Sequence, residues 1–309
     1  MGISRLGLRG VQGRFYLEYE NILAAGWQND VSVFVTTDQE LEEYGWISQA
    51  PMLREWIGGR KVAALSENSV IVRNKTFEAT IGIPVDDIRR DKSAQIGIRV
   101  NGLAGRAADH PHVLLTALIE SPGNCYDGSA FFGTAHAEGA SGTQVNAFTN
   151  SQISVLNVAD HTAVTPAELI NCVLKVVEAM FAFKDDQGQV MNANAKAFTV
   201  MVPSGMWASA IQAFSLSVIL EGGQPRINPI TNVNGYTFRV IVNPRLTAAS
   251  VFYVFRTDGS AKPFVFQEEL FETDEKDETF ENNRVLFGVK AIRNVGPLFW
   301  QMAAKATLS

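Results

Sequence analysis

The stretch NCYDGSAFFGTAHAEG, residues 124–139, brings a cysteine, an aspartate and a histidine close together in the sequence. A Cys/His pair can perform nucleophilic catalysis, because the imidazole can deprotonate the thiol and later return the proton to a leaving group. Cys125 and His136 are therefore the candidates for a hydrolytic site. A working thiolate also needs a base oriented by a third group, and neither CYDG nor TAHAEG matches a nucleophile signature. The pattern favours a buried thiol beside a tight turn at Asp127-Gly128.

Metal and phosphate chemistry find little support elsewhere in the sequence. His110 and His112 flank Pro111, and histidines so spaced share a metal only in an extended chain, whereas this stretch has helical periodicity. The acidic run ETDEKDETFENN, residues 272–283, lacks the alternating ligands and the glycine of a calcium loop and is typical of a solvated hairpin loop. No phosphate-binding glycine motif is present. We therefore expect no catalytic residue, no metal and no cofactor.

Composition places the chain among mildly acidic globular proteins. Its 309 residues are 46% hydrophobic, which is ample for a sizeable core. The formal net charge is −6 and the pI is about 5.3, so the chain lacks the basic surface of a protein that reads nucleic-acid sequence. Two cysteines are too few for a disulfide framework and suit a reducing compartment. We expect neither a signal peptide nor a membrane span, because no apolar run is long enough.

The elements that must position these residues begin with a segment of weak periodicity. Residues 1–56 contain loop-forming residues, a β-rich run at VSVFVTT and an aromatic cluster that includes Tyr44, Trp46 and Trp56. We expect no long helix here, and we expect the aromatic side chains to pack on another surface.

A change to period two over residues 57–84 indicates strands. In KTFEATIGIP, Phe77 and Ile81 fall on one face and the polar residues fall on the other, while SVIVRN just before it is rich in β-branched residues. We interpret this segment as a long β-hairpin whose turn lies at Arg73-Asn74-Lys75 or at Ser66 to Ser69.

Helical periodicity follows. The spacing of apolar residues predicts a helix from Ser93 to Asp109, which Pro111 kinks or interrupts before HVLLTALIE continues to a stop at Ser121-Pro122-Gly123. Thr165-Pro166-Ala167-Glu168 has the residues of a capping box and begins a helix over residues 165–184. The segment between these helices, EGASGTQVNAFTNSQ, is expected to be a loop.

The remaining elements mix helices and antiparallel strands without βα alternation, so the predicted class is α+β. A short helix is expected around Trp207, Ile211 and Phe214. Strands are expected at AFTVMVP, YTFRVIV, VFYVFRT, PFVFQEEL and NRVLFGVKAIR. The projecting hairpin, the rod-like helix and an aromatic segment without its own core together indicate a subunit of an assembly.

Six stretches carry a resemblance to a known family. They are YGWISQAPMLREWIGGRKV, NKTFEATIGIPVDDIRRD, GLAGRAADHPHVLL, CYDGSAFFGTAHAEG, KPFVFQEE and VLFGVKAIRNVGPLFWQMA. In this order, from about residue 44 to residue 303, they resemble the major head (capsid) subunits of Mu-like tailed bacteriophages, whose fold is typified by phage HK97. The resemblance is weakest over the first 40 residues and over about 140–245.

The resemblance implies a division of the chain. Residues 1–56 would form an N-terminal arm, 57–84 an extended loop, 85–139 the peripheral domain with its long spine helix, 140–250 the axial domain, and 251–309 the return to the peripheral domain. The residues expected to contact neighbouring subunits are Trp46, Trp56, Lys61, Arg73, Phe77 and Ile81.

The resemblance also implies a function. The chain would be a structural protein without enzymatic activity, found in the virion and assembled in the bacterial cytoplasm as pentamers and hexamers of an icosahedral head. Its partners would be further copies of itself, a separate scaffold or protease, a portal, a decoration protein and packaged double-stranded DNA bound without sequence preference, but no membrane. Two alternatives stay open: an encapsulin-like compartment, and a cytosolic cysteine hydrolase that uses Cys125 and His136.

Overall fold

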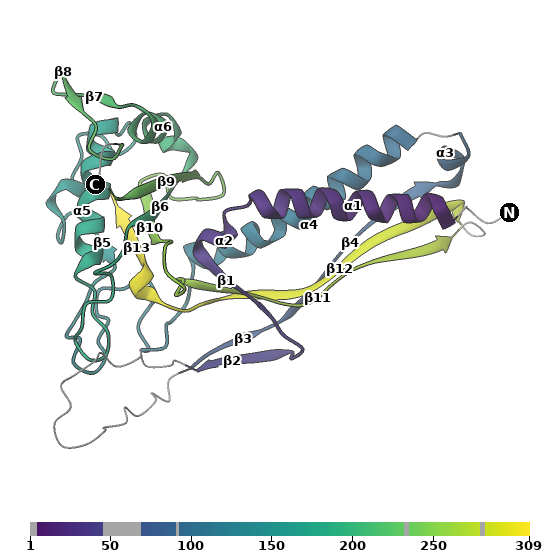
Figure 1. The fold of residues 1–309 in the computed structure, drawn as a ribbon, viewed down its shortest axis with the longest axis horizontal. Helices are drawn as coiled ribbons and strands as arrows, with labels where there is room; N and C mark the ends of the chain where they lie inside the picture. Colours follow the sequence, from purple (N-terminus) through teal and green to yellow (C-terminus); the bar gives the residue numbers. More distant parts are fainter. Residues whose placement is uncertain (1–4, 46–68, 91–92, 232–234, 279–281) are drawn as a thin grey trace.

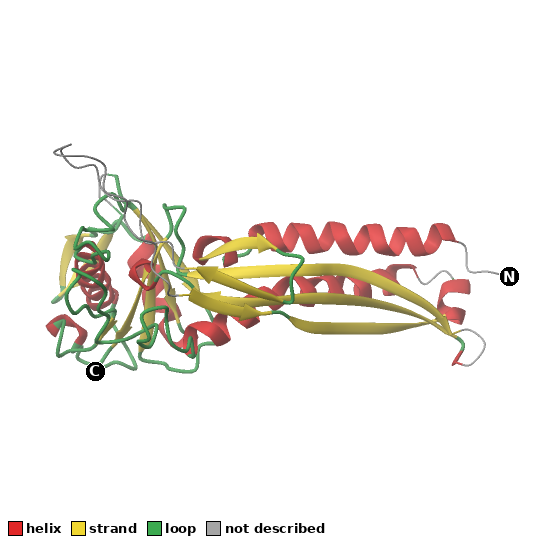
Figure 2. Cartoon of the chain, turned by 90° about the horizontal axis from the view of Figure 1, so that it is seen from below, coloured by secondary structure: helices red, strands yellow, loops and turns green. Residues whose placement is uncertain are grey.

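The computed structural model describes residues 5–45, 69–90, 93–231, 235–278 and 282–309, which form an elongated arm joined to a rounded lobe (Figure 1). In the arm, two long helices run beside a sheet of long strands, whereas the lobe is built around a second sheet (Figure 2). None of the helices in the described ranges is both long and apolar enough to cross a membrane.

The arm contains a four-stranded sheet in the order β1-β11-β12-β4. β1 (Ser32–Thr36) is parallel to β11 (Phe264–Glu278), and β12 (Arg284–Pro297) pairs antiparallel with both β11 and β4 (Lys75–Pro84). The strands predicted from VSVFVTT, PFVFQEEL and NRVLFGVKAIR are confirmed. The acidic run was predicted to be a loop, but its first part, up to Glu278, belongs to β11 because it pairs with β12.

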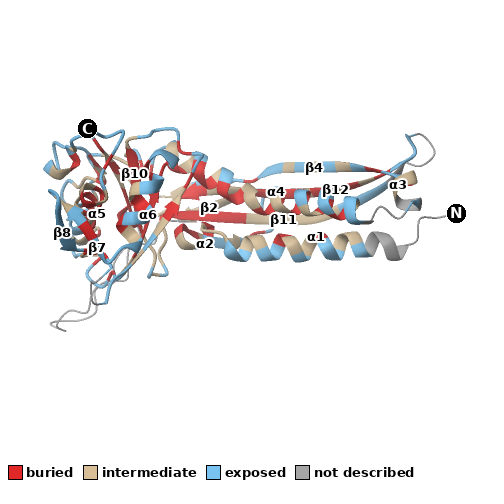
Figure 3. Cartoon of the chain, turned by 90° about the horizontal axis from the view of Figure 1, so that it is seen from above, coloured by how far each residue is buried: buried red, intermediate tan, exposed pale blue. Residues whose placement is uncertain are grey.

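The helices α1 (Arg5–Ala25) and α4 (Ser93–Glu120) pack against each other and cover one face of this sheet. The expectation that the first 56 residues hold no long helix is wrong. Glycines lower the helix propensity of α1, and its buried face consists mainly of Phe15 and Tyr19, so its sequence pattern is weak. Those two rings pack in a cluster with side chains of α4, β4 and β12. In Figure 3 the buried residues of the arm are coloured red.

Pro111 does not interrupt α4, which continues as one helix from Ser93 to Glu120. The short helices α2 (Gln28–Val31) and α3 (Val85–Arg89) lie near the two ends of the arm (Figure 1).

A two-stranded ribbon of β2 (Leu41–Gly45) and β3 (Ser69–Arg73) lies on the other face of the long sheet. β3 pairs with β2, and β4 pairs with β12, so a hairpin turn at Arg73-Asn74-Lys75 is wrong. The alternative turn at Ser66 to Ser69 lies mostly outside the described residues. Alternation of side chains shows that a segment is a strand with two different faces, but it does not identify the partner strand.

The lobe contains a five-stranded sheet in the order β5-β13-β10-β6-β9. Its strands are β5 (Ala147–Phe148), β6 (Ala197–Val202), β9 (Thr237–Val242), β10 (Val251–Arg256) and β13 (Ala303–Thr307). β10 and β13 therefore join strands from the 140–250 segment in one sheet. Single-turn helices at Ser154–Leu156, Ser204–Met206 and Trp300–Met302 connect these elements.

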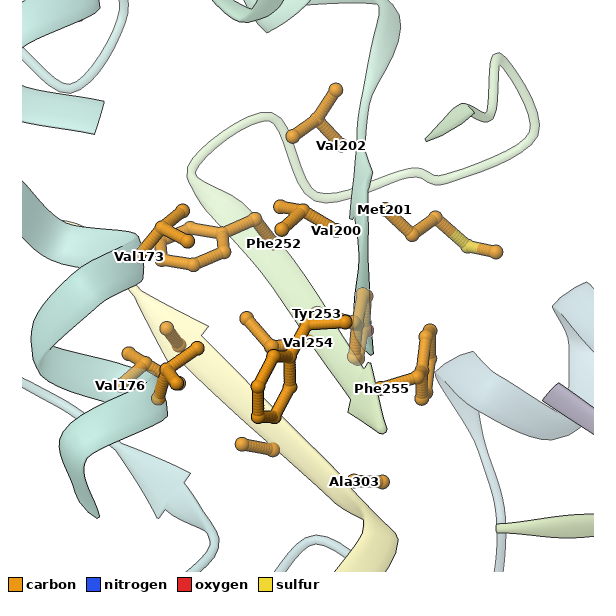
Figure 4. Close-up of a cluster of buried hydrophobic side chains, with 14 of the residues drawn as sticks. Val173, Val176, Val200, Met201, Val202, Phe252, Tyr253, Val254, Phe255 and Ala303 are labelled. Atoms are coloured by element: carbon orange, nitrogen blue, oxygen red, sulfur yellow. The ribbon is translucent and has the colours of Figure 1, made fainter. Parts of the chain in front are cut away.

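Two helices and a hairpin complete the lobe. α5 (Pro166–Phe181) begins with the predicted capping box, because the Thr165 side chain accepts from the backbone of Glu168 and the Glu168 carboxylate accepts from the backbone of Thr165. α6 (Trp207–Ser215) is the predicted short helix, and β7 (Val218–Glu221) forms a hairpin with β8 (Gln224–Ile227). Side chains of α5 meet those of β6 and β10 in the core of the lobe (Figure 4).

Candidate assembly interface

In the Cys125–His136 loop, the side chains of Cys125 and His136 make hydrogen bonds to different partners. The thiol of Cys125 donates to the carbonyl oxygen of Leu298 at 3.6 Å, and burial raises the pKa of this thiol far above its ordinary value. His136 is completely buried, and its Nδ1 lies 2.6 Å from Oδ2 of Asp127. Its ring stacks on Trp300 with the centroids 4.1 Å apart. A thiol held in its neutral form beside a carbonyl lacks the activated thiolate that hydrolysis requires.

Asn146 is the centre of this loop, and the sequence interpretation missed it. Its Oδ1 accepts from the backbone N–H of Gly133 at 2.9 Å and lies 3.3 Å from Nε2 of His136. Its Nδ2 lies 2.8 Å from the carbonyl oxygen of Phe131 and 3.3 Å from those of Trp300 and Ala303. An asparagine in a Gly/Ser/Thr-rich segment looks like an ordinary loop residue, so only the fold reveals this role.

Acidic side chains gather beside the same loop without forming a metal site. Burial raises the pKa of Glu138, and the nearby carboxylates of Asp186, Asp127 and Asp185 raise it further. Throughout the described ranges, no cluster of three or more His, Cys, Asp or Glu side chains is arranged to hold a metal ion.

The residues predicted to contact other subunits have different environments. Arg73 is exposed at the end of β3. Phe77 is half-buried and packs edge-on against His110, with the ring centroids 4.3 Å apart, while Ile81 packs against the apolar cluster beneath α1 and α4. Both β4 side chains therefore contribute to the core of their own arm. Trp46, Trp56 and Lys61 lie outside the described residues.

Exposed apolar side chains are concentrated on the hairpin and helix at the tip of the lobe. Val218 and Ile227 lie opposite each other in the β7–β8 hairpin, and both, with Leu220, lie on the face away from buried Ile219. Leu220 and Ile227 are each 69% exposed. Trp207 of α6 is also exposed. An alternating strand pattern does predict one outward face, but sequence alone does not show that this face is the apolar one.

A second group of exposed apolar side chains lies on the strands around the ribbon. Phe34 of β1, Leu41 of β2 and Ile71 of β3 are 53%, 40% and 60% exposed, respectively. The chain thus presents uncovered apolar side chains both at the tip of the lobe and along the arm, which is the pattern of a protein that contacts several neighbours.

Comparison with known proteins identifies the family. The family described as "Mu-like prophage major head subunit gpT" matches residues 9–171 and 239–309. The major capsid protein of Escherichia phage Mu is 31% identical over 110 residues, which are 35% of this chain and 36% of that protein. The Mu-like prophage FluMu major head subunit of Haemophilus influenzae is 30% identical over 151 residues, or 46% of this chain and 47% of that protein. The matched regions thus span less than half of the length of these relatives.

The fold is shared with a solved phage capsid. The chain superposes on a subunit of the procapsid of bacteriophage JBD30 with a TM-score of 0.53 and 21% identity, covering 99% of this chain and 77% of that chain. The α+β architecture is therefore that of the HK97-like capsid fold. Because the family match includes both the arm and much of the lobe, the chain belongs to the Mu-like prophage major head subunit family.

Proposed function

We propose that this chain is the major capsid protein of a tailed double-stranded DNA phage head and has no enzymatic activity. Copies associate as pentamers and hexamers that close into an icosahedral shell. Membership of the head-subunit family supports this function, and the observation that carries it is the set of exposed apolar side chains on two distant parts of the molecule. Full burial of one large apolar side chain contributes about 1.5–3 kcal/mol.

Several weak contacts are sufficient for such a shell. Each copy touches several neighbours through the lobe tip and through the strands around the ribbon, and the contact free energies act together once a ring has formed. Individual contacts of a few kcal/mol also let wrongly placed copies dissociate before the shell closes.

The proposed domain assignment differs from the expected division in three respects, and in the first of them α1 and β1 of the expected N-terminal arm join the peripheral domain. The lobe acts as the axial domain around the five- and six-fold positions, and it includes β10 and β13. The long sheet with α1 and α4 acts as the peripheral domain. The extended loop includes the β2–β3 ribbon, and β4 belongs to the peripheral sheet.

The acidic net charge fits a container that holds its genome weakly. A shell with a densely basic inner face would bind DNA phosphates strongly and in a salt-dependent manner, which would oppose packaging and release. DNA is thus enclosed without sequence preference. A scaffold or protease, a portal and a decoration protein are the further partners in this proposal.

The alternatives differ in what a particle contains and in the state of Cys125. An encapsulin-like compartment would enclose cargo proteins and not DNA, and membership of the phage head family favours DNA. A cysteine hydrolase would require a thiolate, whereas Cys125 is buried and donates to a carbonyl.

Electron microscopy of the purified protein tests the proposal. The protein is expressed alone, and then together with a candidate scaffold or protease partner. We expect capsomer rings or closed shells of uniform size, at least with the partner. A compact monomer under both conditions would overturn the proposal, and cargo proteins in shells that lack DNA during infection would establish the compartment.

A further inference from the structure

Pro111 leaves one carbonyl of α4 without its usual partner. In an α-helix each N–H donates to the carbonyl four residues earlier, and proline has no N–H. The carbonyl of Ala107 therefore lacks a donor within the helix, although Ala107 is only 8% exposed. A buried carbonyl left in this way is unfavourable, and its partner must come from outside the helix.

Arg293 of β12 supplies that partner. Its Nη2 donates to the carbonyl oxygen of Ala107 at 2.9 Å, its Nε donates to Nδ1 of His110 at 3.1 Å, and its Nη1 donates to Oε2 of Glu268 at 3.2 Å. The side chain is 2% exposed, so these bonds form away from solvent. All three guanidinium nitrogens are used, and together they fix α4 to the sheet. We call these four residues the Arg293 junction.

The residues next to the Arg293 junction in sequence form hydrogen bonds on the opposite face of the sheet. Successive residues of a strand point to opposite faces, and Asn294 and Gln267, which follow and precede junction residues, point toward the ribbon. Asn294 Nδ2 donates to the carbonyl oxygen of Arg73 at 2.7 Å. Gln267 Nε2 donates to Oδ1 of Asn74 at 2.7 Å and lies 3.1 Å from the carbonyl oxygen of Val72.

The two faces are connected through one short piece of sheet. Glu268 pairs with Arg293 and Gln267 pairs with Asn294, and the register of the two strands shifts immediately afterwards, between Glu268 and Leu270. Such a bulge bends the strand and interrupts the regular ladder locally. Two adjacent residue pairs thus link α4 on one face of the sheet with the base of the ribbon on the other.

We propose that Arg293 replaces the missing amide hydrogen of Pro111 and thereby couples the position of α4 to the attachment of the β2–β3 ribbon across the sheet. Every residue involved belongs to one chain, so the coupling is a property of the single chain. It does not depend on whether the chain assembles into the proposed shell. The proline and the arginine act as a pair, because Pro111 leaves the Ala107 carbonyl without a donor and Arg293 supplies one.

A double-mutant cycle on the full chain tests the pair. Arg293→Met is introduced alone and together with Pro111→Ala, which restores an N–H that can donate to Ala107. The loss of the Glu268 and His110 contacts is common to both backgrounds and cancels in the cycle. We expect Arg293→Met to lower the thermal midpoint at least twice as far in the natural chain as in the Pro111→Ala background. Equal shifts in the two backgrounds would overturn the proposal.

Lys290→Met is the matched control for this cycle. Lys290 is a cation of the same strand, but it is about 40% exposed and approaches Glu272 at 3.8 Å. Its effect should be the same in the natural chain and in the Pro111→Ala background. If Arg293→Met prevents folding, Arg293→Lys replaces it, because lysine keeps the charge beside Glu268 and loses the three-way geometry.

Hydrogen exchange tests the connection across the sheet. Arg293→Met should speed exchange of the Asn74 amide, which donates to the carbonyl of Glu40 on the opposite face. In return, Asn294→Ala should speed exchange of α4 amides around His112, because coupling between two sites is reciprocal. Changes that stay on the mutated face in both variants would show that the two faces are independent and would overturn the coupling.

Discussion

Asn146 shows how far a loop can depend on one buried amide. Its side chain serves five partners, three of which are backbone carbonyls, and a carbonyl that loses its donor in a dry environment is unfavourable. We expect Asn146→Ala to lower the free energy of unfolding by about 2–5 kcal/mol, measured by urea denaturation. Asn150→Ala, at an exposed position, should change it by less than about 0.5 kcal/mol. Equal effects would refute the central role of Asn146.

Cys125 offers a test of the enzymatic alternative. Because its thiol is buried and neutral, Cys125→Ala should cost about 1 kcal/mol of unfolding free energy through lost packing and leave particle formation unchanged. Cys172→Ala, at the other buried cysteine, is the control and should behave alike. Particle yield is measured by electron microscopy after sedimentation. A well-folded Cys125→Ala protein that fails to assemble would show that the thiol has a role beyond packing.

The environment of His110 predicts that the stability of the folded chain depends on pH. Burial, together with the nearby guanidinium of Arg293, lowers its pKa from the ordinary 6.5 to about 4, although Asp109 acts in the opposite direction. Glu78 and Arg106 line the same pocket. Between pH 6.5 and pH 4 the unfolded chain binds a proton that the folded chain does not, so the stability contributed by neutral His110 is lost as the pH falls through this window.

Thermal midpoints measured between pH 6.5 and pH 4 test whether the stability falls as the pH falls. His110→Gln should flatten the fall of the midpoint between pH 6.5 and pH 4, because the protonation step has been removed. His161→Gln changes an exposed histidine and should leave the slope as it is in the natural protein. A slope that is identical in all three proteins would mean that His110 does not titrate differently in the folded chain.

Among the elements, α5 has the most complete local signal. The capping box satisfies backbone N–H groups at both Thr165 and Glu168, and these two residues are only three positions apart in sequence. Thr165→Ala should therefore lower the free energy of unfolding by about 1 kcal/mol. Thr162→Ala is the control, since that hydroxyl bonds Asp160 in a solvent-exposed turn and no helix begins there. A smaller effect at Thr165 than at Thr162 would contradict the importance of the cap.

The same comparison explains which elements the sequence predicts well. α5, α6 and the lobe strands β6, β9 and β10 were predicted because their apolar residues, caps and turn residues lie within a few positions of one another. The short strands β5, β7, β8 and β13 were not predicted, and β5 lies in the segment that was expected to be a loop. α1 was missed because its buried side chains, Phe15 and Tyr19, find partners more than 60 residues away on other elements. The turn at Arg73-Asn74-Lys75 was wrong for a related reason: β3 and β4 are both strands, but their partners lie elsewhere in the chain.

The candidate sites show the same difference between features that nearby residues determine and features that distant parts of the chain determine. Cys125 and His136 could be identified as residues of interest, and the environment that keeps the thiol neutral comes from Leu298 and from burial. Phe77 and Ile81 were correctly placed on one face of a strand, but that face covers α4 of the same chain. The apolar face of the β7–β8 hairpin was not predicted, since exposure depends on how the lobe packs around it.

At the scale of the molecule, the lobe tip is where association can be tested with least disturbance of the fold. Leu220 is 69% exposed in the single chain, so Leu220→Asp should leave the thermal midpoint of the unassembled protein almost unchanged. If the tip contacts a neighbour, the buried aspartate should reduce particle yield at least tenfold. Leu220→Met preserves the apolar character and should assemble normally. Normal assembly of Leu220→Asp would remove this surface from the proposed interface.

The long sheet has a consequence for the time at which the arm can form. β1 pairs with β11, and β4 pairs with β12, so strands made early must wait for about 200 further residues before their partners exist. At ordinary rates of synthesis this delay is about 10 to 40 s. The unpaired edges of β1 and β4 stay open to other nascent chains throughout that period, which makes the growing polypeptide a natural client for a chaperone on the ribosome.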